Sequence, residues 1–173
     1  MKNLKIKSVF ALGIMLTAMI ISFSSCSKDN EVAADYVGTW VAISSMDGSD
    51  TKETMTFTSN SVTNLLQIKY ATTNTWVDYI SMKGSISVNK QLMTVTLTEI
   101  GLAFDFMTGE PTATMTTYKA GSTLFDLILE GSEQSASFQS EYSVSGNTLT
   151  LKTDNNDDGD YLDEDESTTY TKQ

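Results

Sequence analysis

The feature that most constrains the fold is an alternation of apolar and polar side chains with a period of two residues. It is clearest in residues 91–99, which read QLMTVTLTE. Alternation with this period predicts a β-strand with one buried face. Comparable segments recur along the chain at a spacing of about 8 to 12 residues, which is typical of an all-β sandwich or barrel.

Short turns rich in Gly, Asn, Ser and Asp separate these segments, and no convincing helical period interrupts them. Neighbouring segments are expected to pair in chain order. This favours an antiparallel up-and-down β-barrel of about 8 to 10 strands, because closure removes exposed sheet edges. A β-sandwich is the alternative. Residues 100–107 are expected to form a strand or a barrel-capping loop, and strands are expected at, among others, 38–45, 54–58, 61–70, 75–82, 85–88, 91–99, 112–119, 123–130, 135–144, 147–153 and 167–172.

The first 25 residues have the layout of an export signal. Three lysines occur in residues 1–7, an apolar run covers 9–23, and Ser24-Ser25 precedes Cys26. The apolar run is shorter than the roughly 20 residues that a membrane-spanning helix needs. We therefore predict that residues 1–25 are a signal peptide that is removed.

Small residues directly before Cys26 resemble the lipobox of bacterial lipoproteins. The resemblance implies that Cys26 becomes the lipidated N-terminus, and that residues 26–35 are a flexible tether to a membrane. Lys28-Asp29 is similar to signals that direct lipoproteins to the outer membrane and its outer face, so the bacterial outer membrane is the expected location. An ordinary secreted protein with one free cysteine is the alternative.

Charge and missing residue types exclude several functions. The net charge of −11 becomes more negative when the three lysines of the signal peptide are removed, and it repels nucleic acid. The chain has no arginine and no histidine. Histidine-dependent catalytic sites, histidine metal ligands and bidentate arginine clamps are therefore excluded. Because Cys26 is the only cysteine, no intrachain disulfide can form.

Residues 36–173 resemble the small bacterial lipocalin-like domains that follow a lipoprotein signal. The similarity lies in 38–40 (GTW), in 55–57 (MTF), and in the hairpin 142–151. It implies a barrel that Trp40 plugs at its closed end. In lipocalins an arginine of the last strand covers this tryptophan; here Lys172 or Lys152 is the candidate to do so.

A barrel of this size either holds one small ligand or is filled by its own side chains. The first outcome predicts a non-enzymatic binding module for a small apolar or glycan ligand. The second predicts a structural or protein-interaction lipoprotein. Paired carboxylates of a glycoside hydrolase are a weaker alternative, with Asp78, Asp105, Asp126 and Glu130 as the acids considered. The candidate ligand-lining residues are Trp76, Tyr79, Phe104, Phe106 and Tyr118.

The acidic segment 154–166 is a candidate calcium site. Asp154, Asn156, Asp158 and a following glycine match the first six positions of a calcium-loop pattern. Alternate oxygen ligands in such a loop converge on one Ca²⁺ ion. Further candidate ligands are Asp160, Asp165 and Glu166. A solvated acidic loop is the alternative, because the flanks are predicted strands and not the helices of an EF-hand.

Overall fold

The computed structural model describes residues 34–46, 49–70, 74–132, 134–154, 161 and 166–173. The predicted signal peptide, Cys26 and most of the tether lie outside these ranges. The buried apolar residues of the described part form one cluster, which extends in sequence from Tyr36 to Tyr170. The described residues therefore contain a complete hydrophobic core of their own.

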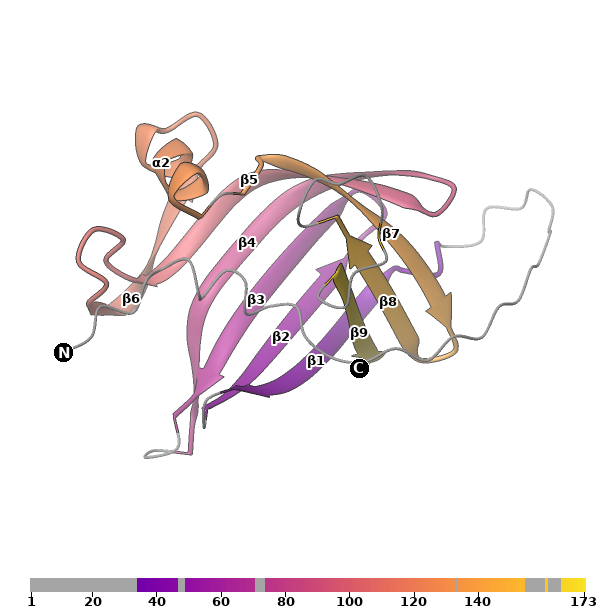
Figure 1. Cartoon of the computed structure of the whole chain (residues 1–173), viewed down its shortest axis with the longest axis horizontal. Coiled ribbons are helices and arrows are strands. Elements are labelled where there is room, and N and C mark those ends of the chain that lie inside the picture. Colours follow the sequence, from indigo (N-terminus) through magenta and orange to yellow (C-terminus); the bar gives the residue numbers. More distant parts are fainter. Residues whose placement is uncertain (1–33, 47–48, 71–73, 133, 155–160, 162–165) are drawn as a thin grey trace.

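The strands of the described residues form a single antiparallel sheet, and eight of them close it into a barrel (Figure 1). The order around the barrel is β1-β2-β3-β4-β5-β7-β8-β9, and β9 pairs again with β1. The predicted all-β barrel is confirmed in preference to a sandwich, because one continuous sheet closes on itself. The strands are β1 (Gly38–Met46), β2 (Ser49–Phe57), β3 (Ser61–Lys69), β4 (Trp76–Asn89), β5 (Leu92–Phe104), β6 (Pro111–Lys119), β7 (Ser137–Ser145), β8 (Thr148–Thr153) and β9 (Ser167–Lys172).

Strand β5 is shared between the barrel and an extension of the sheet. Its first half, Leu92 to Thr96, pairs with β7 and closes the barrel, whereas Glu99 to Phe104 pairs with β6. The register between β4 and β5 shifts at Lys83/Gly84. A Cβ atom on Gly84 would lie 2.8 Å from the carbonyl oxygen of Thr96, so glycine is needed there. The β4–β5 pair is thus longer than the other hairpins and carries β6 beyond the barrel.

One predicted strand is wrong: residues 123–130 belong to a helix, α2 (Thr123–Ser132). Its buried residues are Phe125, Ile128, Leu129 and Ser132, which follow the i, i+3, i+4, i+7 spacing of one helix face. The hydroxyl oxygen of Ser122 accepts a hydrogen bond from the Phe125 amide at 3.3 Å and caps the helix. The apolar residues of this segment fit both the two-residue period of a strand and the 3.6-residue period of a helix. The helix forms because it buries one apolar face beside the β5–β6 extension.

Two neighbouring boundaries also differ from the prediction. Segments 75–82 and 85–88 form the single strand β4, and 91–99 continues through most of 100–107 as β5. The strand ends before Asp105, whose carboxylate accepts hydrogen bonds from the amides of Met107 and Thr108 at 2.9 and 2.8 Å. This turn leads back into β6.

Candidate functional site

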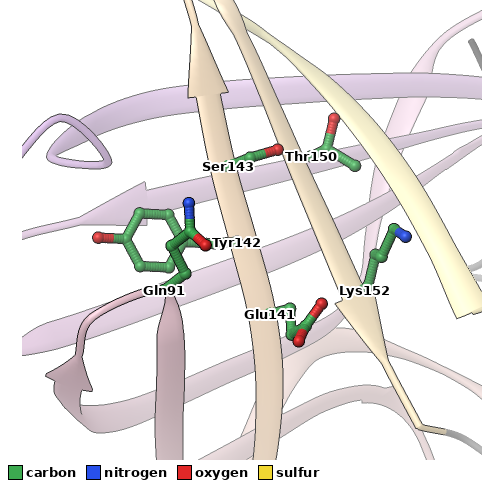
Figure 2. A pocket seen from close by; sticks show the side chains of 6 residues that line it. All are labelled: Gln91, Glu141, Tyr142, Ser143, Thr150 and Lys152. Atoms are coloured by element: carbon green, nitrogen blue, oxygen red, sulfur yellow. The ribbon is translucent and has the colours of Figure 1, made fainter. Parts of the chain in front are cut away.

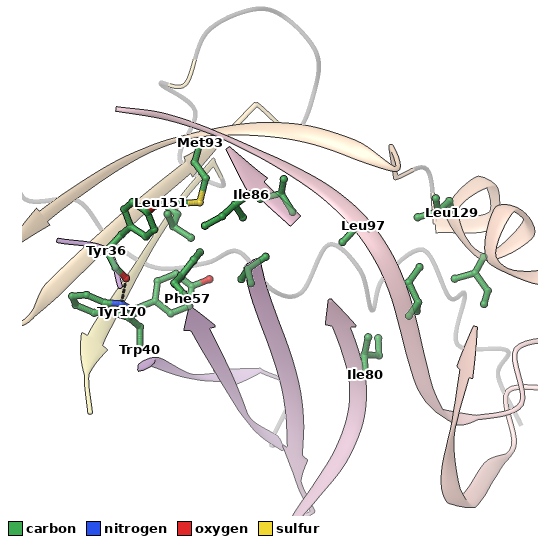
Figure 3. Packing of buried hydrophobic residues seen from close by; sticks show 14 of the residues in the cluster. Tyr36, Trp40, Phe57, Ile80, Ile86, Met93, Leu97, Leu129, Leu151 and Tyr170 are labelled. Atoms are coloured by element: carbon green, nitrogen blue, oxygen red, sulfur yellow. Dashed lines mark hydrogen bonds between the residues drawn. The ribbon is translucent and has the colours of Figure 1, made fainter. Parts of the chain in front are cut away.

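One end of the barrel is sealed by Trp40, which is completely buried. Its indole nitrogen donates a hydrogen bond to the carbonyl oxygen of Tyr36 at 2.8 Å, drawn as a dashed line in Figure 3. The Lys172 Nζ atom lies 5.0 Å from the Trp40 ring centroid. Gly38 has a φ of 141°, and a Cβ atom there would lie 3.1 Å from Lys172 Cε. Because Gly38 has no side chain, the aliphatic part of Lys172 has room to lie beside Trp40.

Of the two lysines that the sequence offered as a cover for Trp40, Lys172 and Lys152, it is Lys172 that lies over the ring. It is the residue opposite Trp40 in the β1–β9 register. Lys152 instead lines a polar pocket of about 200 Å³ on the barrel surface, next to its cross-strand neighbour Glu141 (Figure 2). The other lining residues are Gln91, Tyr142, Ser143 and Thr150. This pocket is separate from the barrel interior, and its lining is mainly polar.

The inward-facing wall of the barrel is not buried uniformly. Side chains on the same face as Trp40 point inward, and the register places Ala42 opposite Glu53 and Glu53 opposite Leu66. Several inward apolar side chains pack against the core yet keep part of their surface exposed. Solvent therefore reaches part of the inward apolar surface. These partly exposed residues are Ala42, Met55, Leu66, Met82 and Phe138.

Glu53, Asn64 and Tyr170 form a polar cluster on this inward face. The Asn64 amide nitrogen donates a hydrogen bond to Glu53 Oε1 at 2.6 Å. The Tyr170 hydroxyl donates to Glu53 Oε2 at 2.9 Å. Asn64 Oδ1 is buried and has no hydrogen-bond partner in the part of the chain that the structure describes. An unpaired buried acceptor costs about 1–3 kcal/mol, so this atom is available to a donor from a bound molecule.

The surroundings of this cluster change its titration. Burial raises the pKa of Glu53 above its ordinary value of 4.5, while the hydrogen bonds from Tyr170 and Asn64 act in the opposite direction. Burial also raises the pKa of Tyr170 well above 10.0, and the nearby Glu53 charge adds to this effect. The two shifts have the same origin: a carboxyl and a phenol share an enclosed site of low polarity.

Sequence inspection did not single out this cluster. A signal was present, because Glu53 alternates in phase with Met55 and Phe57 on strand β2, which places an acid on the inward face. Strand alternation does not reveal the hydrogen-bond partners of Glu53. Asn64 lies on β3, and Tyr170 is 117 residues away on β9, so only closure of the barrel brings it to Glu53.

The five predicted lining residues lie in different places. Tyr79 and Phe104 stack on each other, with ring centroids 4.9 Å apart. Phe106 lies against Gly131 of α2, where an added Cβ would be 2.9 Å from the ring. Tyr118 is opposite Ile100 in the β5–β6 register. These four residues gather where β5 leaves the barrel.

Trp76 is apart from the other four. Its cross-strand neighbour Lys69 is on the outward face of β3, and the Nζ atoms of Lys52 and Lys69 lie 5.0 and 5.7 Å from its ring centroid. Trp76 is therefore on the outside of the barrel. The acids considered for hydrolysis are also exposed and lie on separate elements: Asp78 on β4, Asp105 in the turn after β5, and Asp126 and Glu130 on α2.

Most of the candidate calcium loop lies outside the described residues, namely Asn156, Asp158, Asp160 and Asp165. Asp154 is partly buried, and Glu166 is almost completely buried at the start of the last strand. Within the described ranges, no group of three or more acidic, histidine or cysteine residues has an arrangement that could hold a metal ion. Calcium binding by this loop stays a prediction.

Among the described residues, no helix has the length and apolar character needed to cross a membrane. In searches against known proteins, no protein-family model and no curated protein matched the chain.

Proposed function

We propose that this chain is a membrane-anchored, non-enzymatic lipoprotein whose barrel binds a small, mainly apolar ligand. The observation that carries the proposal is the partial exposure of apolar side chains on the inward face of the barrel. The side chains of Met55, Leu66 and Met82 point inward, pack against the core and remain partly exposed. A concave apolar wall with a few polar groups is the usual form of a small-ligand site.

The anchor in this proposal rests on the sequence. A basic start, an apolar run and small residues before Cys26 support export and lipidation. Attachment through more than one acyl chain holds a protein stably at a membrane. We place the protein at the bacterial outer membrane, where a tethered barrel could take up ligand on either face.

A neutral fluorescent probe such as N-phenyl-1-naphthylamine tests the binding function. We expect it to gain fluorescence with a soluble protein of residues 27–173, which contains the whole described core. Ala42→Phe projects a ring into the interior and should weaken probe binding about tenfold or more. Val41→Phe is the matched control, because Val41 is on the opposite face of the same strand, and it should leave binding unchanged.

The alternative is a structural or protein-interaction barrel that is filled by its own side chains. It is favoured by the apolar residues that are exposed on and near α2, namely Met107, Leu124 and Leu127. A filled barrel would not bind the probe, and Ala42→Phe would then overpack it and lower the free energy of unfolding by about 1–3 kcal/mol. Loss of stability without probe binding would therefore select this alternative.

A further inference from the structure

We propose that the ligand carries a protonated amine, which binds to Glu53 and Asn64 inside the barrel. This inference rests on the proposed binding function and specifies its ligand. It starts from the hydrogen bonds of the polar cluster: counted over the described part of the chain, Glu53 accepts one at each carboxylate oxygen and Asn64 Oδ1 accepts none.

The number of free acceptors matches an ammonium group. A carboxylate has about four lone-pair sites, so each Glu53 oxygen can accept a second hydrogen bond beside the one that it has. Asn64 Oδ1 is a third acceptor, on the same amide that already donates to Glu53. A primary ammonium has three N–H donors. Such a ligand has as many donors as the cluster has acceptor atoms with room for another hydrogen bond.

The charge of the interior also selects a cation. Glu53 forms no ion pair within the described ranges. The nearby lysines contact tryptophan rings and not Glu53. Lys52 and Lys69 lie over Trp76 on the outer face, and Lys172 lies over Trp40. A partly buried carboxylate without a counter-ion is costly, and a cationic ligand would offset that cost. A ligand with a carboxylate would instead be repelled by the charge of Glu53.

The side chains around Asn64 allow a ligand to reach it. Its cross-strand neighbours on the inward face are Met55 and Met82, one on each side. Methionine is unbranched and flexible, so both side chains can rearrange around a guest molecule. An alkyl or aromatic tail would then lie along the partly exposed apolar wall that includes Leu66 and Phe138. The ligand class is therefore an amphiphilic amine.

The experiment compares three probes with the same chain length: dodecylammonium, dodecanol and dodecanoate. Each is used to displace N-phenyl-1-naphthylamine from residues 27–173 at neutral pH. We expect dodecylammonium to bind at least tenfold more tightly than dodecanol, and dodecanoate to bind most weakly. This ranking needs no variant, so it does not depend on how well a substituted protein folds.

Glu53→Gln should remove the advantage of the amine and leave dodecanol binding within about twofold. Glu141→Gln is the matched control: it makes the same change of charge at an exposed position on β7 and should leave the ranking as it is. Equal binding of amine and alcohol, tighter binding of the carboxylate, or an equal effect of both variants would overturn the inference while the binding function stands. If N-phenyl-1-naphthylamine itself does not bind, the proposed function fails, and the inference fails with it.

Discussion

The hydroxyl of Tyr170 donates a hydrogen bond to Glu53 Oε2 at 2.9 Å, and this joins the last strand of the barrel to the second. Both residues point into the interior, and the same carboxylate accepts a hydrogen bond from Asn64 on β3. Three strands thus meet at one acid on the inward face of the barrel. Such networks are costly when they are incomplete, so the unpaired Asn64 oxygen is the feature that most directly suggests a missing partner.

The pH dependence of stability should contain a contribution from Glu53. Its pKa is raised in the folded state, mainly by burial, so the folded protein holds this proton to higher pH than the unfolded chain does. The contribution is fully present below the unfolded pKa and is lost as pH rises through the folded pKa. Urea unfolding at a series of pH values should therefore show Glu53→Gln becoming more stable, relative to the unmodified protein, as pH rises above the ordinary range of a glutamate carboxyl. A difference between the two proteins that is independent of pH would contradict this.

The lysine cover of Trp40 should contribute modestly to stability. Lys172→Ala is expected to lower the free energy of unfolding by about 0.5–1 kcal/mol, because cation–π contacts at exposed sites are of this size. Lys172→Arg should retain the contact, since the guanidinium group stacks on aromatic rings. Lys119→Ala, at an exposed position on β6, is the control in the same denaturation experiment. An alanine variant at 172 that is as stable as the control would argue against the cover.

Helix α2 should depend on its buried face. Ile128→Ala is expected to cost about 2–5 kcal/mol, because Ile128 is completely buried. Leu124→Ala should change stability by no more than about 0.5 kcal/mol, since Leu124 is largely exposed. Thermal or urea unfolding of both variants checks this pair. Similar losses in the two variants would contradict the difference in burial between Ile128 and Leu124.

Lipidation should depend on Cys26. The unmodified protein, expressed in a bacterium with a lipoprotein pathway, should incorporate labelled fatty acid and fractionate with membranes. Cys26→Ser removes the thiol that accepts the lipid and should release the protein in soluble form, whereas Ser27→Ala should not. Membrane association that survives the serine substitution would contradict the lipobox interpretation.

Calcium should bind to the acidic loop if its oxygen ligands converge. Calorimetric titration of residues 27–173 with Ca²⁺ is expected to give heat of binding, with a dissociation constant near that of extracellular modules, about 0.1–1 mM. The melting temperature should rise with Ca²⁺, because ligands that bind the folded state stabilise it. Asp158→Asn should weaken binding and Asp126→Asn should not. Absence of heat, together with an unchanged melting temperature, would favour a solvated loop.

Local pattern was sufficient for most strands but not for all elements. Residues 91–99 alternate so regularly that burial of one face allows only a strand, and β5 confirms this. The apolar residues of 123–130 are spaced so that they fit the period of a strand as well as that of a helix. The helix forms there because Phe125, Ile128 and Leu129 are buried together in the core.

The sequence by itself determined the class of fold, because strand alternation depends only on neighbouring residues. It also left one choice open, between Lys172 and Lys152 as the cover of Trp40. The tertiary structure decided that choice, together with the polar cluster and the outward position of Trp76. The physical reason is that these features depend on strand register and closure, which bring together residues as far apart as Glu53 and Tyr170.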